Sequence, residues 1–219
     1  EVAFYLPGLL STEKQVATGL VHLADADTPQ SPSRDYLSRW VDKRAEMGAT
    51  ALSDEQVDAL DMALSQPVSI ITGGPGTGKT TVTRAISDAA DALGWDVALC
   101  SPTGRAAKRL SQLANKPAST IHRLLAYDPR THTFSHDEDN PLAADLIIVD
   151  ETSMLDVVLA RDLLRAIEPG ARLVFIGDAD QLPSVGPGAF FQDIVASEVF
   201  AVCRLQQVFH HADNVLAVA

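Results

Sequence analysis

The sequence lacks several features that would restrict where the protein works. No apolar run approaches the about 18 residues that cross a membrane, and residues 1–30 show no basic, apolar and small-residue order typical of a signal peptide. Cysteine is scarce: Cys100 and Cys203 are far apart and have no metal-ligand spacing. These absences predict a cytoplasmic protein without membrane contacts, in which both thiols are reduced and packed.

Net positive charge is also absent. Lysine and arginine number 17 against 29 acidic residues, which gives a net charge of −12. This balance argues against a protein that coats a polyanion by overall electrostatics. Any contact with DNA must therefore come from a local groove.

The sequence divides into two regions with different patterns of apolar residues. Residues 1–50 lack strand alternation and predict a small helical N-terminal appendage. The spacing from Thr12 to Gln15 predicts a capping box at the start of one helix, and Ser33 is expected to cap a second. Residues 51–219 then form the main domain.

Apolar strands alternate with helical segments throughout the main domain. The longer strands are expected at 68–72, 97–101, 146–149 and 173–176, with a short one near Val202, and the polar stretch 128–140 is expected to be a loop. This alternation predicts an α/β fold with a parallel sheet covered by helices on both faces. Ligands of such sheets bind at the carboxyl ends of the strands.

A glycine-rich segment follows the first of these strands. Residues 73–80 fit the pattern G-x-x-x-x-G-K-[ST], between a strand and a helix, which is the context in which the pattern binds phosphate. Its backbone N–H groups would surround a polyphosphate, Lys79 would reach the β- and γ-phosphates, and the Thr80 hydroxyl would ligate Mg²⁺. The expected ATP-binding residues are Gly73, Gly74, Pro75, Gly76, Thr77, Gly78, Lys79, Thr80 and Thr81.

Carboxylates and amides follow other strands at the same edge. Asp150 is predicted to bind the metal and Glu151 to orient or deprotonate the attacking water; the alternative is an acidic helix start that suits the helix dipole. Gln181 is predicted to sense the γ-phosphate, or else is an exposed loop residue. Gln56 lies in Ser53-Asp54-Glu55-Gln56, a capping box, so capping is favoured over ligand binding there.

Taken in order, these segments resemble the motifs of superfamily 1B DNA helicases of the RecD-like group. The resemblance covers about residues 52–219, and the segment from Leu6 to Leu10 with its following helix also resembles the region before the motor. The motifs that carry it are Gln56, Gly73–Thr80, Ser101–Ala107, Ser119–Leu125, Asp150–Met154 and Gly177–Pro183.

The resemblance implies a P-loop NTPase of RecA-like fold that couples hydrolysis of ATP to 5′–3′ movement on single-stranded DNA, in recombination or repair. It implies that Gln56 contacts adenine and that Lys79, Glu151 and Gln181 are catalytic. The residues it places on DNA are Pro102, Thr103, Thr120 and His122. Hydroxyl and backbone groups can bind phosphates without a basic surface. The alternatives are that both threonines are helix caps and that His122, like most lone histidines, is a hydrogen-bonded structural residue.

The sequence departs from the family pattern near its end. His210 and His211 stand where the fourth motif carries an arginine that reaches the γ-phosphate, and an imidazole lacks the guanidinium's charge and fork. If His210 replaces that arginine, hydrolysis should be slowed. A second RecA-like domain is not encoded in 219 residues, so we expect it elsewhere in a longer natural chain, and helicase–nuclease subunits are further possible partners.

Two rival interpretations and one metal site stay open. The motifs also fit the helicase part of a conjugative relaxase or a replication-linked motor, and His210 fits a degenerate ATP-binding module that does not hydrolyse. His132, His136 and Asp137 suggest a metal site, but a solvated loop is favoured because no cysteine or rigid helix supports them.

Overall fold

A computed structural model describes residues 6–29 and 31–209. Its centre is a parallel sheet of six strands, which confirms the predicted α/β class. From one edge to the other the strands are β3 (Ala118–Thr120), β2 (Val97–Ser101), β6 (Leu146–Val149), β7 (Arg172–Gly177), β1 (Val68–Gly73) and β8 (Ala201–Leu205). None of the described helices has the length and apolar character needed to span a membrane.

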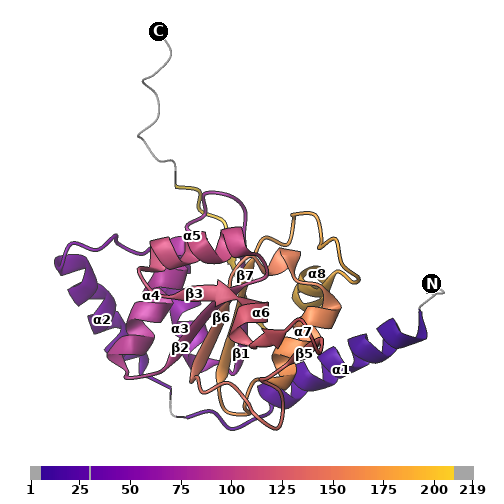
Figure 1. The fold of residues 1–219 in the computed structure, drawn as a ribbon. Coiled ribbons are helices and arrows are strands. Elements are labelled where there is room, and N and C mark those ends of the chain that lie inside the picture. Colours follow the sequence, from indigo (N-terminus) through magenta and orange to yellow (C-terminus); the bar gives the residue numbers. More distant parts are fainter. Residues whose placement is uncertain (1–5, 30, 210–219) are drawn as a thin grey trace.

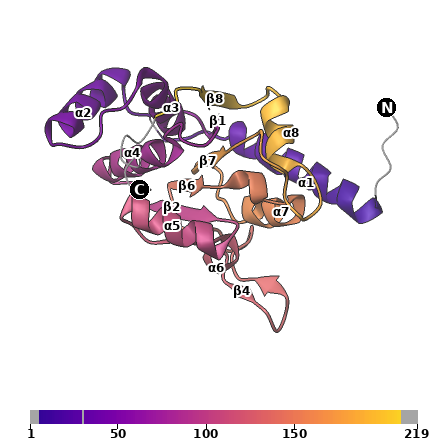
Figure 2. The same ribbon diagram turned by 90° about the horizontal axis from the view of Figure 1, so that it is seen from above.

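Helices cover both faces of the sheet (Figures 1 and 2). Successive strand residues point to opposite faces, so Leu173 and Phe175 pack on one side and Val174 and Ile176 on the other. The first side is covered by α1 (Pro7–Ala24), α6 (Ile121–Leu124), α7 (Val157–Arg165) and α8 (Phe190–Ala196). The second is covered by α2 (Arg34–Glu46), α3 (Asp54–Ser65), α4 (Lys79–Ala92) and α5 (Gly104–Ala114).

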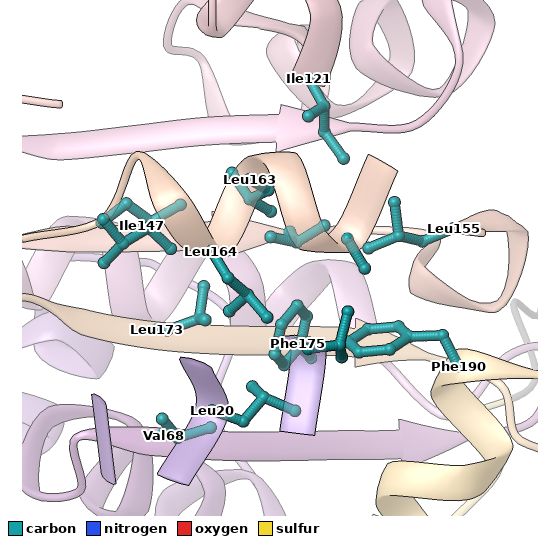
Figure 3. Packing of buried hydrophobic residues seen from close by; sticks show 14 of the residues in the cluster. Leu20, Val68, Ile121, Ile147, Leu155, Leu163, Leu164, Leu173, Phe175 and Phe190 are labelled. Carbon is teal, nitrogen blue, oxygen red and sulfur yellow. The ribbon is translucent and has the colours of Figure 1, made fainter. Parts of the chain in front are cut away.

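Helix α1 packs into the same core as the sheet. Figure 3 shows Leu20 on the side of the sheet that carries Val68 and Phe175, and the helix lies along α7. The capping box expected at Thr12 is wrong: the helix begins at Pro7, which is favourable at a first helical position, and the Thr12 hydroxyl donates to Gly8 O (3.0 Å) inside it. The cap predicted at Ser33 is confirmed. The boundary at residue 50 stays a prediction.

The stretch 128–140, predicted to be a loop, contains part of a short hairpin. Strands β4 (Tyr127–Asp128) and β5 (Thr133–Phe134) pair antiparallel and project from the body in Figure 2. Helix α7 begins at Val157 because the Asp156 carboxylate accepts the N–H groups of residues 158 and 159; the 3₁₀ turn η1 (Thr152–Met154) precedes it. The sequence of residues 212–219 is also typical of a helix, and this run lies outside the described residues.

Candidate nucleotide-binding site

The glycine-rich loop connects β1 to α4 at the carboxyl edge of the sheet. Gly76 and Gly78 have φ values of 78° and 81°, a left-handed conformation that favours glycine. Helix α4 begins at Lys79, so the N–H groups of its first turn face the loop. Since free N–H groups and the positive end of a helix converge here, the loop has the geometry of an anion site.

Lys79 is folded back onto this loop. Its Nζ donates to Gly73 O (2.5 Å) and Gly74 O (2.9 Å), and the Thr77 hydroxyl also donates to Gly74 O (2.8 Å). These carbonyls hold the ammonium group over the loop. A phosphate oxygen placed there would replace them as acceptor, because an ion-paired hydrogen bond is stronger than one to a neutral carbonyl.

Gln56 closes the loop from the side of α3. The capping box is confirmed: Ser53 N donates to Gln56 Oε1 (3.0 Å) and Gln56 N donates to Ser53 Oγ (3.4 Å). The side chain is 2% exposed, and its Nε2 occupies the space that a Cβ on Gly78 would need. Gln56 therefore caps α3 and also touches the phosphate loop. Its contact with adenine stays a prediction.

Asp150 and Glu151 follow β6 beside this loop. Asp150 Oδ1 accepts Glu151 N (2.9 Å), and Glu151 has a φ of 55°, which turns the chain into η1. The pKa of Asp150 is raised to about 6, chiefly by burial and to a lesser degree by the Glu151 charge. The hydrogen bond from Glu151 N and the charges of Lys79 and Arg109 oppose this rise. The alternative of a helix dipole contact is weakened, because these carboxylates precede a single 3₁₀ turn.

Burial also raises the pKa values of the two cysteine thiols. The pKa of Cys100 is raised to about 12, first by burial and second by the Asp150 charge. Cys203 is half-buried and its pKa is raised by burial and by Asp58 and Glu55. Both thiols are free and protonated, so neither is a nucleophile.

Gln181 joins the segment after β7 to the turn η1 at this edge. Its Nε2 donates to Asp178 Oδ2 (3.3 Å) and its Oε1 accepts the Ser153 hydroxyl (3.4 Å). Ala179 N in turn donates to Thr72 Oγ1 (3.1 Å) on β1. Gln181 thus links the segment after β7 to η1, next to Glu151, and this network extends to the strand that leads into the phosphate loop.

The donor set fits Mg²⁺. This ion prefers oxygen ligands and commonly uses one or two carboxylates together with substrate phosphates. The Thr80 hydroxyl in the first turn of α4 and the Asp150 carboxylate at the end of β6 are such donors, and the charge of Lys79 acts on Asp150. Both residues were predicted as metal ligands, and this role stays a prediction.

The residues predicted to contact DNA lie at the ends of β2 and β3. Thr103 caps α5 by accepting Ala106 N (3.4 Å), and Thr120 caps α6 by accepting Arg123 N (3.2 Å), so both threonines are caps. His122 is exposed and packs on Tyr127 and Phe134 of the hairpin, with ring centroids 5.5 and 5.7 Å away. Pro102 is partly exposed between β2 and α5. Contact with DNA stays a prediction for all four residues.

The histidines of the suggested metal site make local contacts. His132 Nδ1 pairs with Tyr127 Oη (2.9 Å), and His136 Nδ1 with Asn140 O (3.0 Å). No cluster of three or more His, Cys, Asp or Glu side chains suited to a metal occurs among residues 6–29 and 31–209.

Sequence reasoning missed the contacts that the segment after β8 makes with the phosphate loop and with α3. Phe209 N donates to Gly76 O (2.9 Å), and the Phe209 ring lies beside Gly78. The Glu55 carboxylate accepts the N–H groups of Gln206 and Gln207 (2.8 and 3.2 Å). No local pattern predicts contacts between such distant residues. His210 and His211 lie outside the described residues.

A family model described as an AAA domain matches residues 56–187, from Gln56 to the loop after Gln181. The chain belongs to this family. The matched span contains the phosphate loop and the Asp150-Glu151 pair, so the family assignment rests on the same residues as the site.

Curated relatives confirm the resemblance to RecD-like helicases. The chain is 40% identical over 212 residues to the ATP-dependent RecD2 DNA helicase of Deinococcus radiodurans, covering 97% of this chain and 28% of that protein. It is 42% identical over 165 residues to the RecBCD enzyme subunit RecD of Mycobacterium tuberculosis, covering 65% and 28%. The chain therefore spans little more than a quarter of these relatives' length.

A solved structure supports the fold. The Pif1 helicase from Candida albicans superposes with a TM-score of 0.52 and 26% sequence identity, covering 73% of this chain and 40% of that one. This likeness confirms the RecA-like P-loop architecture that the resemblance implied.

Proposed function

We propose that the chain is the first motor domain of an ATP-dependent DNA helicase of RecD type that moves 5′–3′ on single-stranded DNA. The observation that carries this proposal is the edge where hydrogen bonds join the Gln181 loop to the turn after Asp150-Glu151 and to the end of β1, the strand that leads into the phosphate loop. The names of relatives that align along most of the chain support it. The second motor domain is proposed to lie in the remainder of the natural protein, and a helicase–nuclease complex is one possible setting.

Each residue at this edge has a role in the proposed hydrolysis. The loop N–H groups and Lys79 bind the β- and γ-phosphates and neutralise charge, which is most of what phosphoryl transfer asks of a protein. Thr80 and Asp150 would hold Mg²⁺, which supplies further charge neutralisation when bound. Glu151 orients the attacking water and accepts its proton.

Gln181 is proposed to transmit the state of the γ-phosphate. Its hydrogen bonds connect η1, which follows Glu151, to the loop after β7. A change at the γ-phosphate would therefore move the surface formed by η1 and the loop after β7, which a second motor domain can contact. The N-cap regions of α5 and α6, with Thr103 and Thr120, are proposed to bind the phosphates of single-stranded DNA at the same edge.

The decisive experiment measures ATP turnover by the full-length protein with and without single-stranded DNA. We expect DNA to stimulate turnover, and Lys79→Ala to lower it by about 100-fold or more, because a charge that stabilises the transition state is removed. Lys43→Ala, an exposed lysine of α2, is the matched control and should leave turnover unchanged. A Lys79→Ala protein as active as the parent would refute the proposal.

His210 supports one alternative, a module that binds ATP without hydrolysing it. This alternative predicts no turnover by the parent and a gain in His210→Arg, because a finger arginine contributes about 10³-fold or more. Strand displacement from substrates with a 5′ or a 3′ single-stranded tail tests the direction of movement in the same protein.

A further inference from the structure

The segment from Gln206 to Phe209 forms a wall of the phosphate loop. It leaves the end of β8, which pairs with β1 so that Leu205 lies opposite Gly73. It then crosses the loop: Val208 packs against Gly76, and Phe209 donates its N–H to Gly76 O and places its ring beside Gly78. The position of this short segment therefore affects the shape of the loop.

One carboxylate holds the start of this segment. Glu55 Oε2 accepts the N–H groups of both Gln206 (2.8 Å) and Gln207 (3.2 Å), the first two residues after β8. The Glu55 carbonyl also lies 3.5 Å from Cys203 Sγ on β8. An ionised acceptor makes stronger hydrogen bonds than a neutral one, so Glu55 is a charged anchor between two elements 151 residues apart in sequence.

Glu55 and Gln56 are consecutive in the first turn of α3. The Gln56 side chain and the Phe209 ring both lie beside Gly78. Glu55 holds the start of the segment that carries Phe209. The first turn of α3 thus holds both groups that contact the loop glycines: the Gln56 side chain and the segment Gln206–Phe209. Asp54, in the same turn, is exposed and makes no side-chain hydrogen bond among the described residues, which separates the anchoring role from a general benefit of acidic residues at a helix start.

We propose that Glu55 is a positioning residue of the nucleotide site: its carboxylate holds the segment Gln206–Phe209 against the phosphate loop in the conformation that binds ATP. The proposal rests on the proposed function, since it presumes that the loop binds ATP. Glu55 acts through the backbone of this segment and needs no contact with the nucleotide. Without it, the segment samples other positions, and only the anchored fraction binds ATP at full strength.

The test uses the full-length protein with Glu55→Ala, Glu55→Gln and the control Asp54→Ala. Hydrogen exchange measures the amides of residues 206–209, and a fluorescent ATP analogue measures affinity. For Glu55→Ala we expect much faster exchange at 206–209 and unchanged protection of β1 and β7. Binding should weaken about 5- to 50-fold, because only the fraction of molecules with the segment in place then binds at full strength. Glu55→Gln, which retains a neutral acceptor, should lie between Glu55→Ala and the parent.

The outcomes separate this proposal from the proposed function. If the parent binds the analogue and Glu55→Ala binds it equally well, or exchange at 206–209 is unchanged, the positioning role is refuted and ATP binding stands. If Asp54→Ala weakens binding as much as Glu55→Ala, a helix dipole effect explains both and the positioning role is again refuted. If the parent binds no nucleotide, the proposed function fails and this inference fails with it.

Discussion

At the scale of the residue, Asp150 shows how a site residue lowers stability. Its carboxylate is largely removed from water and lies near the Glu151 charge, so its ionised form is held at a cost. The positive charges of Lys79 and Arg109 offset this only in part, since the pKa remains raised at about 6. Groups with shifted pKa values concentrate at functional sites, where a bound cation can stabilise the ionised carboxylate.

Asp150→Asn should therefore stabilise the protein at neutral pH. The folded pKa of about 6 lies above the ordinary aspartate pKa of 3.8, so the folded state holds its proton more tightly and this group's contribution falls as pH rises from about 4 to 6. We expect the variant's free energy of unfolding in urea to exceed the parent's by roughly 1–3 kcal/mol above pH 7. The gain should disappear below about pH 4.

The control for this comparison is Asp42→Asn, which alters an exposed carboxylate of α2. It should change stability by less than about 0.5 kcal/mol at either pH, as surface substitutions usually do. A stability gain in Asp150→Asn that is the same at pH 4 and pH 7.5 would contradict the electrostatic explanation. The same variant should lose Mg²⁺-dependent ATP turnover, since an amide is a poor ligand for this ion.

At the scale of the element, the phosphate loop depends on glycine for two reasons that can be measured separately. Gly78 has a positive φ, and a Cβ there would overlap Gln56 Nε2. Gly94, at the end of α4, has a similar φ of 78°, but no heavy atom lies within 4 Å of the point that a Cβ would occupy. A side chain at either position therefore has to adopt an unfavourable left-handed backbone conformation. Only at Gly78 would it also clash with a neighbouring atom.

Gly78→Ala should destabilise the protein more than Gly94→Ala. We expect a loss of about 1 kcal/mol for Gly94→Ala, the cost of a left-handed alanine, and about 1–3 kcal/mol more for Gly78→Ala because Gln56 must move. Urea unfolding measures both. ATP affinity should fall more than about tenfold in Gly78→Ala only. Equal stability losses in the two variants would mean that Gln56 adapts freely.

The elements differ in how far the sequence predicts them. Strands β2 and β6 match their predicted bounds, and the caps of α2 and α3 match as well, because buried runs and side-chain caps are local signals. Strand β3 and the hairpin β4–β5 are too short for periodicity, and their pairing depends on neighbouring strands. The site follows the same rule. The sequence predicts Lys79 and Asp150 as candidate site residues because each lies in a short local pattern, the glycine-rich segment and the acidic pair after a strand. The contacts of Glu55 and Phe209 join distant segments and leave no local pattern.

At the scale of the whole molecule, the packing of helix α1 tests whether this part of the N-terminal region is an appendage or belongs to the core of the main domain. Val16, Leu20 and Leu23 are buried in one cluster with β1, β7 and α7. Arg172 of β7 adds a hydrogen bond to this region: its Nη2 donates to Pro29 O (2.5 Å) in the linker after α1. Its guanidinium carbon lies over the Trp95 ring, 4.3 Å from the ring centroid. A region held in this way should unfold together with the sheet.

Leu20→Ala tests this cooperativity. Leu20 is 2% exposed, whereas the adjacent Val21 is 46% exposed. Because α1 packs into this core, Leu20→Ala should lower the free energy of unfolding by about 2–4 kcal/mol and the Tm by several degrees, since a cavity opens against the sheet. Val21→Ala should cost less than about 0.5 kcal/mol. Amide exchange in β1 and β7 should then accelerate in Leu20→Ala only, since a shared core opens as a unit. Accelerated exchange confined to α1 would show instead that this helix unfolds independently of the sheet, as an appendage would.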